Sequence, residues 1–142
     1  MQYGKWTYPE ISGQAEALNA ALRQLEQQKE WVGKYIGNDQ FDEVIFIGSG
    51  SSYYQAQTMA STFRKWTGRD ASAYPSSEIF LFRDNNAVPG RRYLLVGVSR
   101  SGESTEVILA LDHCKDAEGW TICGITCYED SKMAAMCECL VS

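Results

Sequence analysis

Two short segments rich in serine and glycine carry the side chains best suited to binding an anion. The first spans Gly48–Ser52 and the second spans Ser99–Ser104. Serine hydroxyls and backbone amides donate hydrogen bonds, and glycine lets the chain approach a ligand closely. Arg100 adds a formal positive charge to the second segment. Both segments therefore predict a site for an anion such as a phosphate group, held mainly by hydroxyls and amides.

The ordinary alternative is that these serines only cap helices. Serine is common at the position before a helix, where its hydroxyl accepts a hydrogen bond from a backbone amide. The two segments together hold six serines, which is more than two helix caps need. An anion site therefore explains the pattern better than capping alone.

Each segment lies between an apolar run and an amphipathic one, which predicts a strand followed by a helix. Strands are expected over Val44–Ile47, Ala71–Tyr74, Tyr93–Val98, Trp120–Thr126 and Leu140–Ser142, and helices over Ser52–Trp66, Ile79–Phe82, Ser104–Glu118 and Ser131–Met136. Strands that are apolar on both faces indicate a parallel sheet covered on both sides. The expected fold is an α/β three-layer sandwich with about five parallel strands, of the flavodoxin or Rossmann kind. Its two serine segments would then meet at the carboxyl edge of the sheet, where such folds bind ligands.

A long amphipathic helix is expected ahead of this sheet, from Pro9 to Ile36. Its apolar residues recur in steps of three and four, at Ile11, Ala15, Leu18, Leu22, Leu25, Val32 and Ile36. Such a stripe packs on its own domain or on a partner subunit. We expect a helical arm over residues 1–40, a domain over residues 41–142, and a homodimer or higher homo-oligomer.

The composition excludes several classes of protein. The 142 residues fit one domain, and a formal charge of −5 without a basic run argues against a nucleic-acid or membrane-surface partner. No apolar stretch is long enough to span a membrane, and no secretory signal precedes the first strand. These features predict a cytoplasmic protein.

The five cysteines, Cys114, Cys123, Cys127, Cys137 and Cys139, are expected to be reduced thiols. A zinc site at the Cys123/Cys127 and Cys137/Cys139 pairs is the alternative, but Cys123 lies inside an apolar run, where buried cysteine is common. We expect no metal.

Familiar catalytic and cofactor motifs are absent from the sequence. The chain has no Gly-x4-Gly-Lys-Ser/Thr phosphate loop, and Gly48–Tyr53 lacks the third glycine of the dinucleotide fingerprint. His113, the single histidine, falls late in a predicted helix, which argues against a Ser-His-Asp hydrolase and for a solvated or cap-side residue. No cofactor is expected.

The two segments resemble the ligand-binding loops of the SIS (sugar isomerase) domain, most closely the first SIS domain of the isomerase portion of glucosamine-6-phosphate synthase and its phosphosugar-isomerase relatives. Gly48–Ser52 is similar to that family's Gly-Cys-Gly-Thr-Ser, and Ser99–Ser104 is similar to its Ser-Gln-Ser-Gly-Glu-Thr. Ser77–Phe80 resembles a Ser-Glu-Phe segment, and Glu10–Gln14 resembles the Glu-Ile-x-x-Gln start of the isomerase portion.

The resemblance implies an SIS-type fold and a phosphosugar ligand. By position, the implied substrate-binding residues are Gly50, Ser51, Ser52, Ser99, Arg100, Ser101 and Ser104. Family isomerases contain two SIS domains, and their acid/base residues resemble nothing in this chain. The catalytic residues are therefore unknown. Glu103 and Glu78 are the available carboxylates, although acids in a first helical turn are more often explained by the helix dipole.

Two functions remain open. The chain is expected to be the substrate-binding half of a ketose/aldose phosphosugar isomerase, aminotransferase or deglycase that lacks the glutaminase domain. The alternative is a non-catalytic sugar-phosphate-binding or sensing module.

Overall fold

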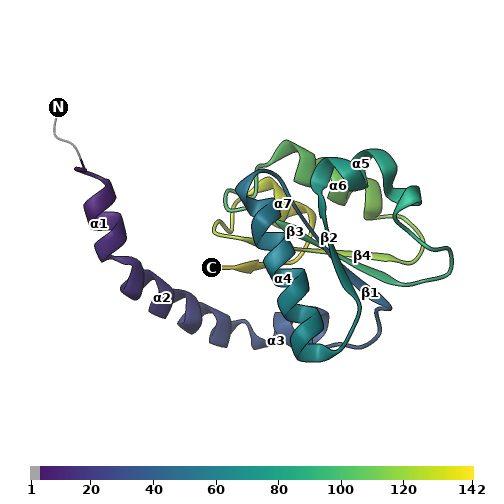
Figure 1. Ribbon diagram of the computed structural model, residues 1–142, viewed down its shortest axis with the longest axis horizontal. Helices are drawn as coiled ribbons and strands as arrows, with labels where there is room; N and C mark the ends of the chain where they lie inside the picture. The colour runs from purple at the N-terminus through teal and green to yellow at the C-terminus, as the bar shows by residue number, and fades with distance from the viewer. Residues whose placement is uncertain (1–3) are drawn as a thin grey trace.

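The computed structural model describes residues 4–142 and has a single five-stranded sheet at its centre (Figure 1). The strands are β1 (Glu43–Gly48), β2 (Ala71–Pro75), β3 (Tyr93–Val98), β4 (Trp120–Thr126) and β5 (Cys139–Val141). They lie in the order β2-β1-β3-β4-β5, and every neighbouring pair is parallel. The predicted parallel α/β sandwich is confirmed.

Helices cover both faces of the sheet. One face carries α4 (Ser51–Thr67) together with the short α3 (Lys29–Trp31) and the π-helical turn η1 (Val32–Ile36). The other face carries α5 (Ser76–Phe82), α6 (Thr105–Cys114) and α7 (Lys132–Met136), and a 3-10 turn, η2 (Arg83–Asn85), follows α5. The three-layer arrangement follows from strands that have no polar face to leave uncovered.

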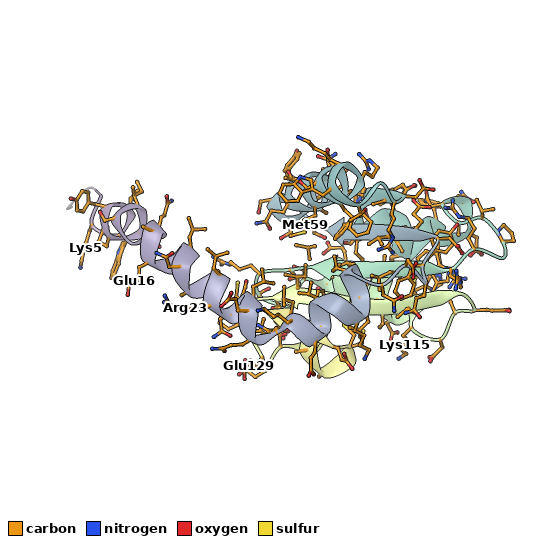
Figure 2. The ribbon with its side chains drawn as sticks, turned by 90° about the horizontal axis from the view of Figure 1, so that it is seen from below. Lys5, Glu16, Arg23, Met59, Lys115 and Glu129 are labelled. Carbon is orange, nitrogen blue, oxygen red and sulfur yellow. The ribbon has the colours of Figure 1, made fainter. Side chains whose placement is uncertain are left out.

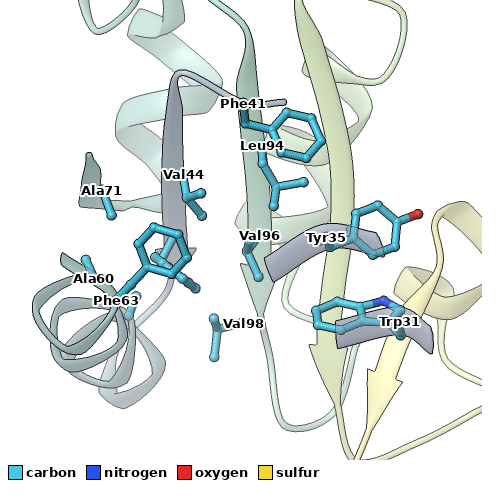
Figure 3. Close-up of a cluster of buried hydrophobic side chains, with 13 residues drawn as sticks. Trp31, Tyr35, Phe41, Val44, Ala60, Phe63, Ala71, Leu94, Val96 and Val98 are labelled. Carbon is cyan, nitrogen blue, oxygen red and sulfur yellow. The ribbon is translucent and has the colours of Figure 1, made fainter. Parts of the chain in front are cut away.

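Alternation along the strands builds two separate cores. In β1, Val44 and Phe46 face α4, whereas Ile45 and Ile47 face α5 and α6. Figure 3 shows the first core, where Val96 lies between Phe63 of α4 and the ring of Trp31. All six residues of β3 are buried. The sheet is therefore a rigid base for the loops at its carboxyl edge.

The N-terminal segment differs from the single long helix predicted for Pro9–Ile36. It is divided into α1 (Thr7–Ser12), α2 (Gln14–Gln27), α3 and η1. Gly13, a weak helix former, separates α1 from α2. Gln28 separates α2 from α3, and its side-chain amide bonds to the backbone of Val141 in β5.

Only the end of this segment packs on the sheet. Trp31 and Tyr35 are buried, whereas α1 and α2 contain no buried residue. The two helices extend away from the domain in Figure 1, and Figure 2 shows their side chains standing clear of it. Residues 1–3 of the predicted arm lie outside the described part of the chain.

The other helices and strands begin and end close to the predicted residues. The helix expected over Ser104–Glu118 ends at Cys114, and α4 is one residue longer at each end than expected. No helix among residues 4–142 has the length and apolarity needed to cross a membrane.

Candidate functional site

The two serine loops lie side by side between β1 and β3, the point at which the order of strands along the sheet changes direction. From β1 the chain moves to β2 on one side, and from β3 it moves to β4 on the other. Because β1 and β3 are neighbours in register, with Ile47 opposite Gly97, the segments that follow them emerge together. Sheets of this topology bind ligands at that switch point.

The first loop turns tightly from β1 into α4. Gly50 has a φ of +56°, a conformation that glycine adopts easily. A Cβ at Gly48 would overlap the carbonyl group of Ser52, so the strand end and the first turn of α4 are in close contact. Ser51 is exposed and Ser52 is half-buried. Neither hydroxyl has a hydrogen-bond partner among the described residues, so both are free to donate to a ligand.

The second loop uses its serines differently, because their hydroxyls hold the loop together. Ser99 is 1% exposed, and its Oγ accepts a hydrogen bond from the Gly102 amide at 3.1 Å and lies 3.0 Å from Ser104 Oγ. Ser101 Oγ accepts from the Glu103 amide at 3.2 Å. These hydroxyls form local turns of a kind that serine favours. They fix the loop's shape and direct Arg100 outward.

A further set of contacts holds the Arg100 backbone against the end of β4. The Arg100 carbonyl accepts hydrogen bonds from the Cys127 amide at 3.0 Å and from Thr126 Oγ1 at 3.3 Å. Thr126 is 1% exposed, so this anchor lies beneath the surface. The Arg100 side chain itself is exposed.

A pocket of about 700 Å³ opens between α4 and the carboxyl ends of β3 and β4. Its lining residues are Ser51, Ser52, Gln55, Met59, Val98, Arg100, Ile125, Thr126, Cys127 and Ser142. Arg100 is the one formally charged side chain among them. The pocket also lies beside the N-terminal end of the 17-residue helix α4, whose partial positive charge favours an anion.

The predicted site residues fall into three groups. Ser51, Ser52 and Arg100 line the 700 Å³ pocket. Gly50 lines a smaller pocket of about 280 Å³ on the other side of the first loop, with Tyr53 and Glu106. Ser99, Ser101 and Ser104 line neither pocket and support the second loop from within.

The carboxylate of Glu103 is engaged in an ion pair. Glu103 Oε2 lies 2.8 Å from Lys132 Nζ, and Glu103 Oε1 accepts a hydrogen bond from the Lys132 amide at 2.8 Å. These contacts hold the pKa of Glu103 below its ordinary value, which is the wrong direction for a general base near neutral pH. Glu103 joins the second loop to α7.

Glu78 is also absent from the larger pocket. Its Oε1 accepts a long hydrogen bond of 3.3 Å from Asn86 Nδ2 on the α5 side of the sheet. No aspartate, glutamate or histidine is among the residues that line the 700 Å³ pocket. Proton transfer there would need a group from beyond this set of side chains.

Seven of the ten lining residues were not predicted as site residues, among them Gln55, Thr126 and Cys127. A usable signal existed for Gln55, which lies one helical turn after Ser51 and so shares its face of α4. For Thr126 and Cys127, the signal was their place just at and after the carboxyl end of β4, the strand next to β3.

The cysteines lie in different environments. Burial raises the pKa of the Cys114 thiol to about 11 and raises that of Cys123, whereas Cys127 is exposed in the pocket. Within residues 4–142, no three or more histidine, cysteine or acidic side chains gather where they could hold a metal ion. His113 is exposed near the end of α6, as predicted, with its ring edge-on to Phe80.

Comparison with known proteins gives consistent matches. A family model described as the SIS domain matches residues 40–141. Over 81 residues, the chain is 31% identical to a glutamine–fructose-6-phosphate aminotransferase (isomerizing) of Tropheryma whipplei, which covers 57% of this chain and 13% of that protein. It is 24% identical to the putative D-galactosamine-6-phosphate deaminase AgaS of Escherichia coli over 112 residues, or 77% of this chain and 29% of that protein.

The fold also matches solved structures. The crystal structure of tagatose-6-phosphate ketose/aldose isomerase from Escherichia coli superposes with a TM-score of 0.84 and 22% sequence identity, covering 97% of this chain and 40% of that one. The chain spans less than a third of the length of the aminotransferase and of the deaminase to which it was compared above.

Proposed function

This chain belongs to the SIS domain family, and from that membership and the geometry of its loops we propose that it binds a phosphosugar in the 700 Å³ pocket. The single observation that carries the proposal is the meeting of Ser51, Ser52 and Arg100 at the switch point of the sheet. Two free hydroxyls, an exposed guanidinium and the start of α4 offer donors and positive potential to a phosphate. Gln55 offers a polar contact to the hydroxyls of a sugar.

In this proposal the predicted site residues take two roles. Ser51, Ser52 and Arg100 contact the ligand, with Gly50 allowing its close approach. Ser99, Ser101 and Ser104 hold the second loop in the shape that places Arg100, and only their backbone or a rotated hydroxyl would reach the phosphate. The relatives' names support a sugar phosphate as the ligand class, since they include a fructose-6-phosphate aminotransferase and a galactosamine-6-phosphate deaminase.

We further propose that the chain is the substrate-binding half of a phosphosugar isomerase, aminotransferase or deglycase, acting in the cytoplasm. In this division residues 1–40 form the helical arm and residues 41–142 the SIS domain, with the proton-transfer groups supplied by a second half. The absence of an acid or histidine from the pocket lining supports that division of labour. The same observation favours the second candidate, a binding or sensing module without catalysis.

The binding proposal is tested by thermal unfolding with matched ligand pairs. Glucose 6-phosphate and fructose 6-phosphate should raise the melting temperature by about 8 °C at a hundred times their dissociation constant, whereas glucose and fructose should not. Equal stabilisation by the free sugars would contradict a phosphate site.

A matched pair of variants locates the site. Ser51→Asp places a negative charge in the pocket, at a helix start where an acid does not harm folding, and should abolish the thermal shift. Ser61→Asp makes the same change at an exposed position in the middle of α4 and should leave the shift intact. Retained binding in Ser51→Asp would remove this pocket as the site.

Turnover shows whether this chain catalyses proton exchange by itself. Fructose 6-phosphate is incubated with the protein in deuterated water, with and without ammonium, and NMR follows the C1 protons of the ketose and the deuterium incorporated at C2 of any aldose formed. Exchange at these carbons would support a catalytic chain. Binding without exchange is the result expected of a half-enzyme or a sensor.

We also propose that the chain self-associates. Six large apolar residues of the arm are 41–75% exposed: Trp6, Tyr8, Ile11, Leu18, Leu22 and Leu25. This is a larger apolar surface than a monomer ordinarily leaves in water.

A further inference from the structure

The exposed stripe of the arm has a counterpart elsewhere on the same chain. An apolar groove of about 370 Å³ runs along α4, opposite η1. Its walls include Met59, Phe63 and Trp66 of α4, with Ile36 of η1 and Ile125 of β4. Trp66 is 81% exposed, so this groove, like the apolar stripe of the arm, leaves large apolar side chains in contact with solvent.

The chain's own arm is directed away from this groove. Gln28 Nε2 donates to the Val141 carbonyl at 2.6 Å, and Gln28 Oε1 accepts from the Val141 amide at 2.8 Å. Trp31 Nε1 donates to the Glu138 carbonyl just after this point. These bonds fix the root of the arm on β5, and from there α2 and α1 extend outward (Figure 1). Figure 2 shows Glu16 and Arg23 of the arm well separated from Met59.

Resting on the self-association proposed above, we infer that the arm of one copy lies in the α4 groove of a second copy, and that the second copy's arm returns the contact. A reciprocal exchange of this kind is the two-fold arrangement in which the same two patches are used twice. The site is the stripe Ile11, Leu18, Leu22 and Leu25 against the α4 groove. The partner is a second copy of this chain.

The area and charge of the two surfaces agree with this pairing. The four stripe residues are 41–67% exposed, which is roughly 400 Å² an arm. The two arms together would bury roughly 800 Å² of their own surface, and a standard stable interface of roughly 1,600 Å² is reached if the α4 surfaces around the two grooves lose a comparable area. The α2 segment carries Glu16 and Glu26 against one Arg23, whereas α4 carries Arg64 and Lys65 and no acid, so the charges beside the two apolar surfaces are of opposite sign.

Sedimentation of two single variants and their mixture tests the exchange. Leu22→Glu disables the arm, and Trp66→Glu disables the groove; both side chains are exposed, so neither change disturbs a core. Each variant alone has no intact contact and should associate at least tenfold more weakly than the wild type. An equimolar mixture keeps one intact arm–groove contact and should form a heterodimer.

Leu81→Glu on α5 is the matched control, because Leu81 and Leu22 are both 61% exposed and Leu81 lies on the opposite face. It should dimerise as the wild type does. A monomeric wild type at 50 μM would overturn the inference and leave the stripe to a partner of another sequence. A dimer that survives Trp66→Glu, or a mixture that stays monomeric, would also overturn it and indicate arm-to-arm pairing in the first case.

The same samples test the sugar-phosphate proposal separately, through the thermal shift with glucose 6-phosphate. Neither Leu22 nor Trp66 lines the 700 Å³ pocket. If the thermal shift with glucose 6-phosphate persists in both variants while association is lost, the pocket stands independently of the dimer. If no variant or wild type shows the shift but association follows the expected pattern, only the ligand proposal fails.

Discussion

Replacing Gly102 by alanine should destabilise the protein more than any ordinary loop substitution. Gly102 has a φ of +65° and is buried between the second serine loop and α7. Its amide donates to the Ser99 carbonyl and Ser99 Oγ, both at 3.1 Å, and its carbonyl accepts from the Met133 amide at 3.1 Å. A methyl group there would overlap Ser131 Oγ and Cβ.

The expected loss of unfolding free energy in Gly102→Ala has two parts. A left-handed backbone costs an alanine about 1 kcal/mol relative to glycine. Forcing a methyl group into a filled space costs about 2 kcal/mol more, because Ser131 is itself held as the cap of α7, where its Oγ accepts from the Ala134 amide. The free energy of unfolding should fall by about 3 kcal/mol, or roughly 9 °C in melting temperature for a chain of this length.

Gly90→Ala supplies the matched control. Gly90 also has a positive φ, +83°, but a Cβ there meets no atom within 4 Å. It should therefore lose only the backbone part, about 1 kcal/mol. Both variants are measured by urea unfolding at pH 7. If Gly102→Ala lost no more stability than Gly90→Ala, the close packing of the second loop on Ser131 would be refuted.

Three further predictions concern the pocket and its support. Arg100→Gln should raise the dissociation constant for glucose 6-phosphate about fivefold and make it less dependent on salt, because an exposed charge-assisted hydrogen bond is replaced by a neutral one. Calorimetry between 50 and 300 mM NaCl measures both effects. An unchanged salt dependence would count against Arg100 as the phosphate contact. Because Lys132 lowers the pKa of Glu103 in the folded state, this carboxylate should stabilise the protein at neutral pH and lose that effect as pH falls below about 4.3 and through the lowered folded pKa. Glu103→Gln should then be less stable than the wild type at pH 7, and the difference should shrink as the pH falls; a difference that grew in acid would reverse the assignment. Finally, exposed Cys127 should be alkylated by iodoacetamide before buried Cys114, whose pKa is raised to about 11. Glucose 6-phosphate should protect Cys127 from this alkylation, which peptide mass spectrometry follows. If Cys127 were labelled equally fast with the ligand present, the ligand would bind away from Cys127.

The sheet and the position of its loops could be predicted because they depend on local patterns. β3 and β4 have the predicted ends, since a strand buried on both faces appears as an unbroken apolar run. The helix expected from Ser131 to Met136 was predicted for a similar reason, since Ser131 caps it and capping preferences act within one turn. Parallel topology then brought the two serine loops to one edge.

The inward roles of the serines could not be predicted in this way. A hydroxyl that binds a phosphate and one that binds a neighbouring amide have the same residue type, and only the buried position of Ser99 distinguishes them. The Glu103–Lys132 pair and the Gln28–Val141 contact join residues far apart in the chain. No local periodicity predicts such pairs, and Gln28 in particular interrupts the helix that periodicity favoured.

The contact between Gln28 and Val141 also has a consequence for solubility. β5 is an edge strand, and an edge presents unpaired amide and carbonyl groups that can recruit another chain's strand. The Gln28 side chain supplies one acceptor and one donor to the same residue of β5, which is what an added strand would have supplied there. The Gln28 side chain therefore blocks the pairing of another strand with β5 at this residue. Gln28→Ala would expose the backbone groups of Val141 to intermolecular strand pairing, and hence to aggregation during storage or refolding.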